Sequence, residues 1–120
     1  RDRRFLVATD ATGKVLGCVA ISSPARRMEK HFNILGDGAR ELLNAFVSRE
    51  VFRGKGVGRA LFDAACSAAR AEGATELVVY SGPRYKESWG FYDRVCDVSA
   101  RFIKDYFGLG IDAKTSRKGL

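Results

Sequence analysis

A glycine-rich turn between an apolar strand and an amphipathic helix constrains this chain more than any other feature. Residues 53–58 read Arg-Gly-Lys-Gly-Val-Gly, and the apolar run 42–47 precedes them. Apolar residues then recur at helical spacing over 57–72, which predicts a helix with one apolar face. The next apolar run, 76–81, completes a strand–helix–strand unit. Such a unit is typical of a parallel strand pair in an α/β sheet.

The same turn has the composition of an anion site. The first N–H groups of a helix lack partners within the helix, and the helix dipole adds a partial positive charge there. Arg53, Lys55 and Arg59 add full positive charges. The turn therefore suits a phosphate or pyrophosphate, although its glycines also suit a plain tight turn. The phosphate loop of nucleotide hydrolases is disfavoured, because Lys55 stands between glycines and no Ser or Thr follows it.

Composition limits the class of protein. The chain has 120 residues, 46% of them hydrophobic, which is enough for a single domain, 1–120. No apolar run reaches membrane-spanning length, so we expect no membrane partner. The net charge of +7 is scattered along the chain, which disfavours nucleic acid as the ligand. Because Cys18, Cys66 and Cys96 are odd in number and far apart, we expect no disulfide framework, no metal site and a cytoplasmic setting.

Hydrophobic patterning and turn residues predict the remaining elements. A turn at 10–13 joins two strands into a hairpin, and Gly73 ends the central helix. The segment 22–40 has little periodicity and is interpreted as a loop with one short helical turn at 26–31. The expected strands are 4–9, 15–21, 42–48, 76–81, 99–103 and 111–116, and the expected helices are 57–72 and 86–95.

Three motifs, in this order, resemble the GNAT superfamily of acyl-CoA-dependent N-acyltransferases over residues 4–120. Arg53, Gly56 and Gly58 form Arg-x-x-Gly-x-Gly behind an apolar strand. Residues 89–94, Trp-Gly-Phe-Tyr-Asp-Arg, are similar to the family's Phe-Tyr-Glu-Lys helix, and residues 104–113 are similar to its closing hairpin. The resemblance implies an α/β fold with a mixed, mostly antiparallel sheet, a central parallel strand–helix–strand unit and a splayed cofactor cleft.

The resemblance also implies acetyl-CoA as the acyl donor. The pantetheine arm would lie in the gap between the splayed strands, and the backbone of the glycine turn would hold the pyrophosphate. Glycines allow the backbone to approach such a ligand closely. The residues expected to bind the cofactor are Phe46, Val47, Ser48, Arg53, Gly54, Lys55, Gly56, Val57, Gly58 and Arg59.

Acyl transfer to an amine needs proton transfers and a donor for the oxyanion. Tyr92 stands where many family members place a phenol facing the CoA sulfur, so the resemblance implies Tyr92 as general acid; its other interpretation is packing beside Phe91. A backbone N–H near Val47 is expected to stabilise the oxyanion. The general base stays open between Glu41, Glu87 and a water relay.

The predicted activity is transfer of an acetyl group from acetyl-CoA to a primary amine, by direct attack in a ternary complex. The acceptor would be a small-molecule or peptide amine, and the positive net charge mildly favours acidic acceptors over polyamines. The alternative is a non-catalytic acyl-CoA-binding module that senses or regulates.

Two departures from the family pattern concern the substrate side. Val95-Cys96-Asp97 replaces Leu-Gly-Phe at the end of the second helix, so we expect a reshaped helix end. The chain also begins at about the family's second strand. We therefore expect the N-terminal strand and helices to be missing and the domain to be N-terminally incomplete. The exposed sheet edge would then favour a homodimer or strand exchange.

Overall fold

The computed structural model describes residues 3–24, 38–48, 56–82 and 88–120. Its strands form one sheet in the order β1-β2-β3-β4-β6-β5, in which β3 and β4 run parallel and the other pairs antiparallel. The expected α/β fold, mostly antiparallel around a parallel strand–helix–strand unit, is confirmed. The elements are β1 (Arg4–Thr9), β2 (Val15–Ser22), β3 (Ala39–Val47), α2 (Val57–Ala71), β4 (Glu76–Ser81), α3 (Trp89–Val95), β5 (Val98–Ile103) and β6 (Ala113–Gly119).

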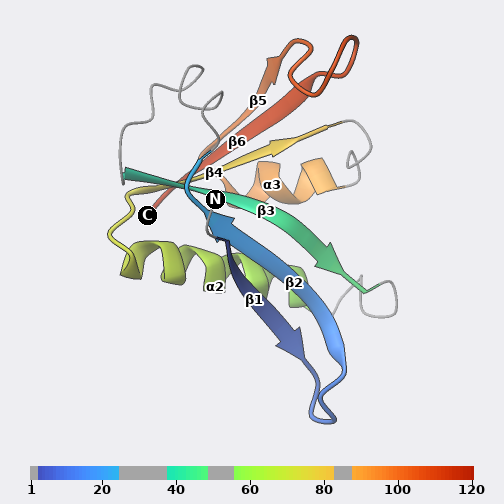
Figure 1. The fold of residues 1–120 in the computed structure, drawn as a ribbon, viewed down its shortest axis with the longest axis vertical. Coiled ribbons are helices and arrows are strands. Elements are labelled where there is room, and N and C mark those ends of the chain that lie inside the picture. Colours follow the sequence, from blue (N-terminus) through green and yellow to red (C-terminus); the bar gives the residue numbers. More distant parts are fainter. Residues whose placement is uncertain (1–2, 25–37, 49–55, 83–87) are drawn as a thin grey trace.

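The sheet opens into a V between β3 and β4 (Figure 1). The two strands pair only where Ala39–Glu41 lies beside Glu76–Val78. Beyond this short ladder β3 follows β2 and β1, whereas β4 follows β6 and β5, and in this view α3 is seen across the opening. The expected splay of the central strands is thereby confirmed.

A β-bulge in β3 coincides with this opening. Cys18 and Ala20, two positions apart in β2, pair with Phe46 and Leu43, which are three positions apart in β3. The extra residue bends the strand and reverses the alternation of its side chains. As a result, Val47 packs against the core beneath the helices.

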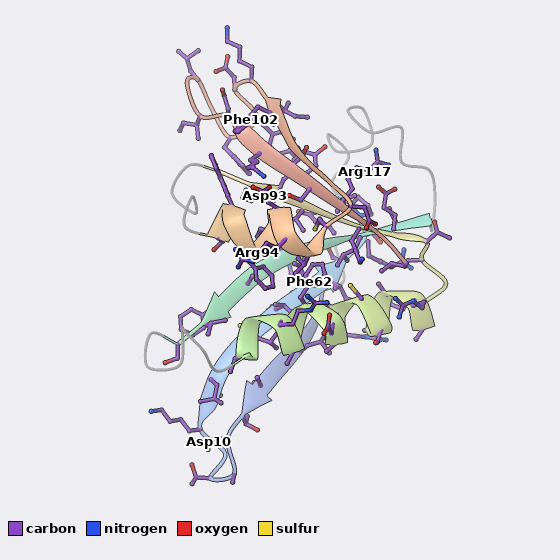
Figure 2. The ribbon with its side chains drawn as sticks, turned by 180° about the vertical axis from the view of Figure 1, so that it is seen from behind. Asp10, Phe62, Asp93, Arg94, Phe102 and Arg117 are labelled. Carbon is purple, nitrogen blue, oxygen red and sulfur yellow. The ribbon has the colours of Figure 1, made fainter. Side chains whose placement is uncertain are left out.

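Both helices cover the same face of the sheet (Figure 2). Phe62 of α2 and Phe91 of α3 meet edge to face, with ring centroids 5.9 Å apart, and so join the two helices. Tyr92 and Val95 of α3 belong to the same core. The buried face of α2 consists of Leu61, Phe62, Ala65, Cys66 and Ala69.

Local signals account for the first hairpin and for the end of α2. The Asp10 carboxylate accepts hydrogen bonds from the Thr12 hydroxyl and from the backbone N–H groups of Thr12 and Lys14, which lower the pKa of Asp10. Gly13 completes the turn with a φ of 88°. Gly73 has a φ of 87°, and the amides of residues 73–74 bond back to the carbonyls of residues 69–70, as in a Schellman motif.

Two strand boundaries differ from expectation by three residues, and the others differ by at most two. β3 begins at Ala39, three residues early, and β6 extends three residues beyond the expected range of 111–116. Charged side chains occupy both extensions. Arg40 donates from Nε to Glu72 at 2.9 Å, and Arg117 pairs with Glu76 of β4. These segments carry charged residues in place of the apolar residues by which a strand is recognised in a sequence, and their ion pairs form only in the folded chain.

Four further expectations concern the segment 26–31, the two ends of the second helix and the edge of the sheet. The helical turn expected at 26–31 lies outside the described residues, as does the expected start of the second helix, since α3 is described from Trp89. Cys96 ends α3 in an extended conformation, with φ −99° and ψ 152°, so the helix end lacks a left-handed cap. β1 is an edge strand whose Phe5 and Val7 are each 55% exposed.

Candidate functional site

Two cavities flank the place where β3 and β4 part. The first, here named the helix-side cavity, has a volume of about 280 Å³ and lies between the end of β3, the start of α2 and α3. Its lining is mostly apolar, which suits an uncharged, flexible ligand segment. The lining includes Phe46, Val47, Gly58, Leu61, Phe91 and Tyr92.

The second, here named the hairpin-side cavity, has a volume of about 270 Å³ and lies between β3, β4 and the β5–β6 hairpin. Its lining includes Glu41, Leu43, Tyr80, Ser81, Gly82 and Phe107. Tyr92, together with Leu42, Ala45 and Ser88, lines both cavities. Two molecules bound one in each cavity would therefore meet beside Tyr92.

Tyr92 is the titratable group at this junction. Its side chain is buried and its ring packs edge to face on Phe91, with centroids 5.5 Å apart. Burial, with a smaller contribution from Cys96, raises the pKa of Tyr92 to about 12. The phenol therefore keeps its proton at neutral pH and is available as a proton or hydrogen-bond donor.

The raised pKa of Tyr92 predicts a loss of stability in alkali. The unfolded chain loses the phenol proton near pH 10, whereas the folded chain retains it up to about pH 12. The contribution of Tyr92 to the free energy of unfolding is fully present below pH 10. It falls by about 2 to 3 kcal/mol as the pH rises toward 12. Urea unfolding of wild type and Tyr92→Phe between pH 8 and 12 measures this, and parallel profiles would show that Tyr92 is not the cause.

The end of β3 places a backbone donor at the gap. The Ser48 N–H donates to the carbonyl of Leu16 at 2.8 Å. Because successive amides of an extended strand point to opposite sides, the N–H of Val47 points away from β2 and toward the gap. Phe46 is 57% exposed at the rim of the helix-side cavity, while Val47 and Ser48 are half-buried.

The start of α2 forms another wall of the helix-side cavity. Gly56 precedes the helix with a φ of 69°, a conformation that favours glycine, and no described side chain caps this end. A methyl group at Gly58 would lie 3.8 Å from the side chain of Val47 and 4.0 Å from that of Phe91. All three residues line the helix-side cavity, so such a methyl group would point into it. Val57 is half-buried beside it.

The charges expected at this turn are only partly described. Arg59 is exposed and its Nε lies 3.0 Å from Oδ1 of Asp63, one helical turn along. Arg53, Gly54 and Lys55 lie outside the described residues. The structure therefore brings Phe46, Val47, Gly58 and Tyr92 together at one cavity, and all the cofactor-binding predictions, these residues included, stay predictions.

Arg94 is a residue of this site that the sequence analysis did not select. It is the one charged side chain among the described residues that line the helix-side cavity. Figure 2 shows it on the side of α3 that faces α2. No described carboxylate forms an ion pair with Arg94, and the neighbouring Asp93 pairs with Lys114 instead. The sequence shows a basic residue two positions after Tyr92. Which side of α3 carries Arg94 relative to the cavity depends on how the helix packs, and the sequence does not show this.

The other candidate groups are distributed as follows. Glu41 is 9% exposed and lines the hairpin-side cavity, whereas Glu87 lies outside the described residues. The three cysteines are free thiols. Within the described ranges no cluster of His, Cys, Asp and Glu could hold a metal ion, and neither helix has the length and apolar character needed to cross a membrane.

Known proteins share this fold. The profile of the Acetyltransferase (GNAT) family matches residues 1–97. A protein from Desulfovibrio desulfuricans assigned to the GNAT family has a TM-score of 0.78 at 20% identity, over 98% of this chain and 68% of its own. Nourseothricin acetyltransferase gives 0.76 at 24% identity, over 98% and 65%. An aminoglycoside 6′-N-acetyltransferase complexed with coenzyme A gives 0.73 at 11% identity, over 98% and 72%.

This chain spans about two thirds of the length of those solved structures. No curated protein sequence shows significant similarity to it. The family profile nevertheless covers most of the chain, and the splayed sheet agrees with the fold of the solved structures. The chain therefore belongs to the GNAT family of acetyltransferases.

Proposed function

We propose that this chain transfers an acetyl group from acetyl-CoA to a primary amine by direct attack in a ternary complex. The observation that carries the proposal is the meeting of the two cavities at Tyr92. One cavity would take the donor and the other the acceptor. A buried phenol with a pKa of about 12 would stand between them.

The helix-side cavity fits an acyl-CoA donor. Its apolar walls suit the pantetheine arm, and the gap-facing N–H of Val47 would pair with that arm or with the thioester oxygen. Gly58 leaves room for the chain of the ligand, and Gly56 turns the backbone toward the first N–H groups of α2. Arg53, Gly54, Lys55, Val57 and Arg59 remain proposed contacts to the pyrophosphate, and Ser48 a proposed neighbour of the arm.

The residues at the junction match the demands of the reaction. When bound, acetyl-CoA supplies the acyl group as a thioester. The new C–N bond forms as the C–S bond breaks, and Val47 N–H would stabilise the negative charge that develops on the carbonyl oxygen. Tyr92 would give its proton to the departing sulfur and recover one from water. The amine proton would leave toward Glu41, directly or through water, and Glu87, which lies outside the described residues, stays the alternative base.

Calorimetry and a thiol-release assay together test this function. Titration with acetyl-CoA should give a heat of association, and mixing with a panel of primary amines should release one thiol per acetylated amine. Binding without turnover on any amine would favour the acyl-CoA-binding module instead. An absence of binding would remove both functions.

Arg94 should contribute to donor affinity through a phosphate of the donor. Arg94 is exposed at the edge of this mostly apolar cavity and forms no ion pair with the described carboxylates, and a charge-assisted hydrogen bond to an anion contributes about 1.5 to 3 kcal/mol. Arg94→Ala should therefore raise the Kd for acetyl-CoA by about 10-fold or more.

The affinity of Arg94→Ala for S-acetylpantetheine, which lacks phosphate, should stay unchanged. Arg70→Ala serves as the matched control, because Arg70 is exposed in the last turn of α2 and lines neither cavity. Equal losses for both donors would show that Arg94 supports the fold of the cavity rather than a phosphate.

A further inference from the structure

The helix that carries Tyr92 is too short to fix its own orientation. α3 has seven residues, about two turns, and helices of this length are marginal on their own. No described side chain caps its start, and Gly90 within it lowers its helix propensity. The rotation of α3 about its axis, and with it the place of Tyr92, therefore depends on contacts with the rest of the chain.

Lys114 of β6 contacts one side of α3. Its side chain is 6% exposed, and its Nζ pairs with the Asp93 carboxylate and lies 5.9 Å from the centroid of the Trp89 ring. Trp89 and Asp93 are four positions apart, so they stand on the same side of the helix, one turn from each other. An ammonium group is attracted both by a carboxylate and by the face of an indole ring. One buried lysine thus holds both turns of α3.

The β5–β6 hairpin makes a second contact with the same side of α3. Phe102 of β5 is the register partner of Lys114, and its ring meets that of Trp89 edge to face, with centroids 5.6 Å apart. Nε1 of Trp89 is buried and finds no hydrogen-bond partner among the described residues. Within this part of the chain the indole ring is therefore oriented by Phe102 and Lys114 and not by a hydrogen bond. Figure 2 shows Asp93 on the side of α3 that faces this hairpin.

Other sides of α3 carry the groups of the candidate site. Tyr92 and Val95 belong to the core that α3 shares with α2. Apolar burial is largely non-directional, so it holds this face against the core but limits the rotation of the helix less than an ion pair does. Successive helical residues are about 100° apart, so a rotation that takes Asp93 away from Lys114 turns Tyr92 by the same angle.

We propose that Lys114 is a positioning residue for acetyl transfer: by holding Asp93 and Trp89 it fixes the rotation of α3 and so keeps the Tyr92 phenol at the junction of the two cavities. The inference rests on the proposed function. Lys114 is not among the residues that line either cavity, so it acts through Tyr92 and not on a substrate. A misplacement of about 1 Å at a reacting group can cost about 100-fold in rate, so a small rotation of α3 is enough to slow the reaction.

Replacing Lys114 by methionine removes the ammonium group and nearly keeps the length of the side chain. Lys114→Met should lower the single-turnover rate of acetyl transfer about 10-fold, because Tyr92 loses its fixed position. The Kd for acetyl-CoA should stay within about threefold of wild type, which separates an effect on the reaction from one on donor binding. Rapid-quench kinetics and calorimetry measure the two quantities.

Lys118→Met is the matched control. Lys118 also lies on β6, and its Nζ is 3.5 Å from Oδ1 of Asp97, which stands beyond the end of α3. Its loss should leave the single-turnover rate within about twofold of wild type. An unchanged rate in Lys114→Met, or an equal loss in Lys118→Met, would overturn the inference.

A double variant separates positioning from stability. Removing one member of a buried ion pair is destabilising, whereas removing both charges is often neutral. Lys114→Met/Asp93→Asn should therefore have a thermal midpoint within about 3 °C of wild type. It should still react about 10-fold more slowly, because nothing replaces the contact that fixed the helix. A rate that recovers together with the stability would overturn the inference, since the ion pair would then act on the fold alone.

The Tyr92→Phe background shows whether Lys114 acts through the phenol. Lys114→Met should there cost at most about twofold in rate, because no phenol remains to be positioned. A further loss of about 10-fold would overturn the inference, because Lys114 would then act by another route.

Amide hydrogen exchange tests the contact of Lys114 with α3 without any turnover. The Cys96 N–H donates to the Tyr92 carbonyl at 2.9 Å at the end of α3. In the double variant this amide should exchange about 10-fold faster than in wild type, measured against the amides of α2, and unchanged exchange would overturn the role of Lys114. Binding of acetyl-CoA without turnover on any amine would instead overturn the proposed function, and the exchange rate would still decide whether Lys114 fixes α3.

Discussion

Replacing Tyr92 by phenylalanine should lower the single-turnover rate of acetyl transfer by about 100-fold or more, because a positioned general acid contributes about 10² to 10⁴ in rate. The ring is retained, so its packing on Phe91 in the core persists. Donor affinity should stay within twofold of wild type, since the change removes one hydroxyl from the mostly apolar lining of the helix-side cavity. Rapid-quench kinetics with saturating acetyl-CoA and amine measure the rate, and calorimetry measures the affinity.

Tyr106→Phe is the matched control for this prediction. Tyr106 is also a buried tyrosine, 8% exposed, but it belongs to the β5–β6 hairpin and is not among the described residues lining either cavity. Its single-turnover rate should remain near that of wild type. An unchanged rate in Tyr92→Phe would mean that the departing thiolate receives its proton from elsewhere, and the phenol would then be a packing residue.

Gly17→Ala should lower the free energy of unfolding by about 2 to 3 kcal/mol, because overpacking a filled site forces backbone shifts. A methyl group at Gly17 would lie 2.6 Å from the carbonyl oxygen of Phe46 and 3.0 Å from the side chain of Leu61. The backbone of β3 cannot move away without breaking the Gly17–Val47 pairing. We expect the midpoint of thermal unfolding to fall by about 10 °C, as measured by circular dichroism.

Gly38→Ala provides the comparison for this loss. The same methyl group would there lie 3.7 Å from Oγ1 of Thr75, an ordinary contact. Its thermal midpoint should stay within about 2 °C of wild type, as for surface substitutions generally. If both variants lost stability equally, the close approach of β2 to the bulged β3 would not be the reason. Gly17→Ala should also weaken donor binding, because Phe46 and Val47 line the helix-side cavity.

Local interactions could be predicted from the sequence because both partners lie close together in the chain. The Asp10 carboxylate reaches amides two and four residues away, and Gly73 ends α2 through its own positive φ. The apolar spacing of α2 follows from the helix repeat alone. These features, and with them the strand–turn–helix unit and its family resemblance, needed no knowledge of the folded chain.

Pairings between residues far apart in the chain could not be predicted in this way. β6 reads as Ala-Lys-Thr-Ser-Arg-Lys-Gly, yet it lies between β4 and β5 and buries Thr115 and Ser116. Its charged residues find partners far away in the chain: Arg117 pairs with Glu76 and Lys114 with Asp93. A seven-residue polar segment gives no local sign of partners that lie 21 and 41 residues away, so the full length of β6 was seen only in the structure.

The candidate site divides along the same line. From the order of residues alone came the glycine turn, the apolar strand before it and the phenol at Tyr92, each part of a contiguous motif. Only the tertiary structure showed that Tyr92 joins two cavities, that Arg94 faces one and Glu41 the other. A motif records which groups neighbour each other along the backbone, whereas a cavity arises from surfaces that strand bulging, splaying and helix packing bring together. For that reason the sequence determined the family, and the folded chain decided which of the described side chains line each of the two cavities.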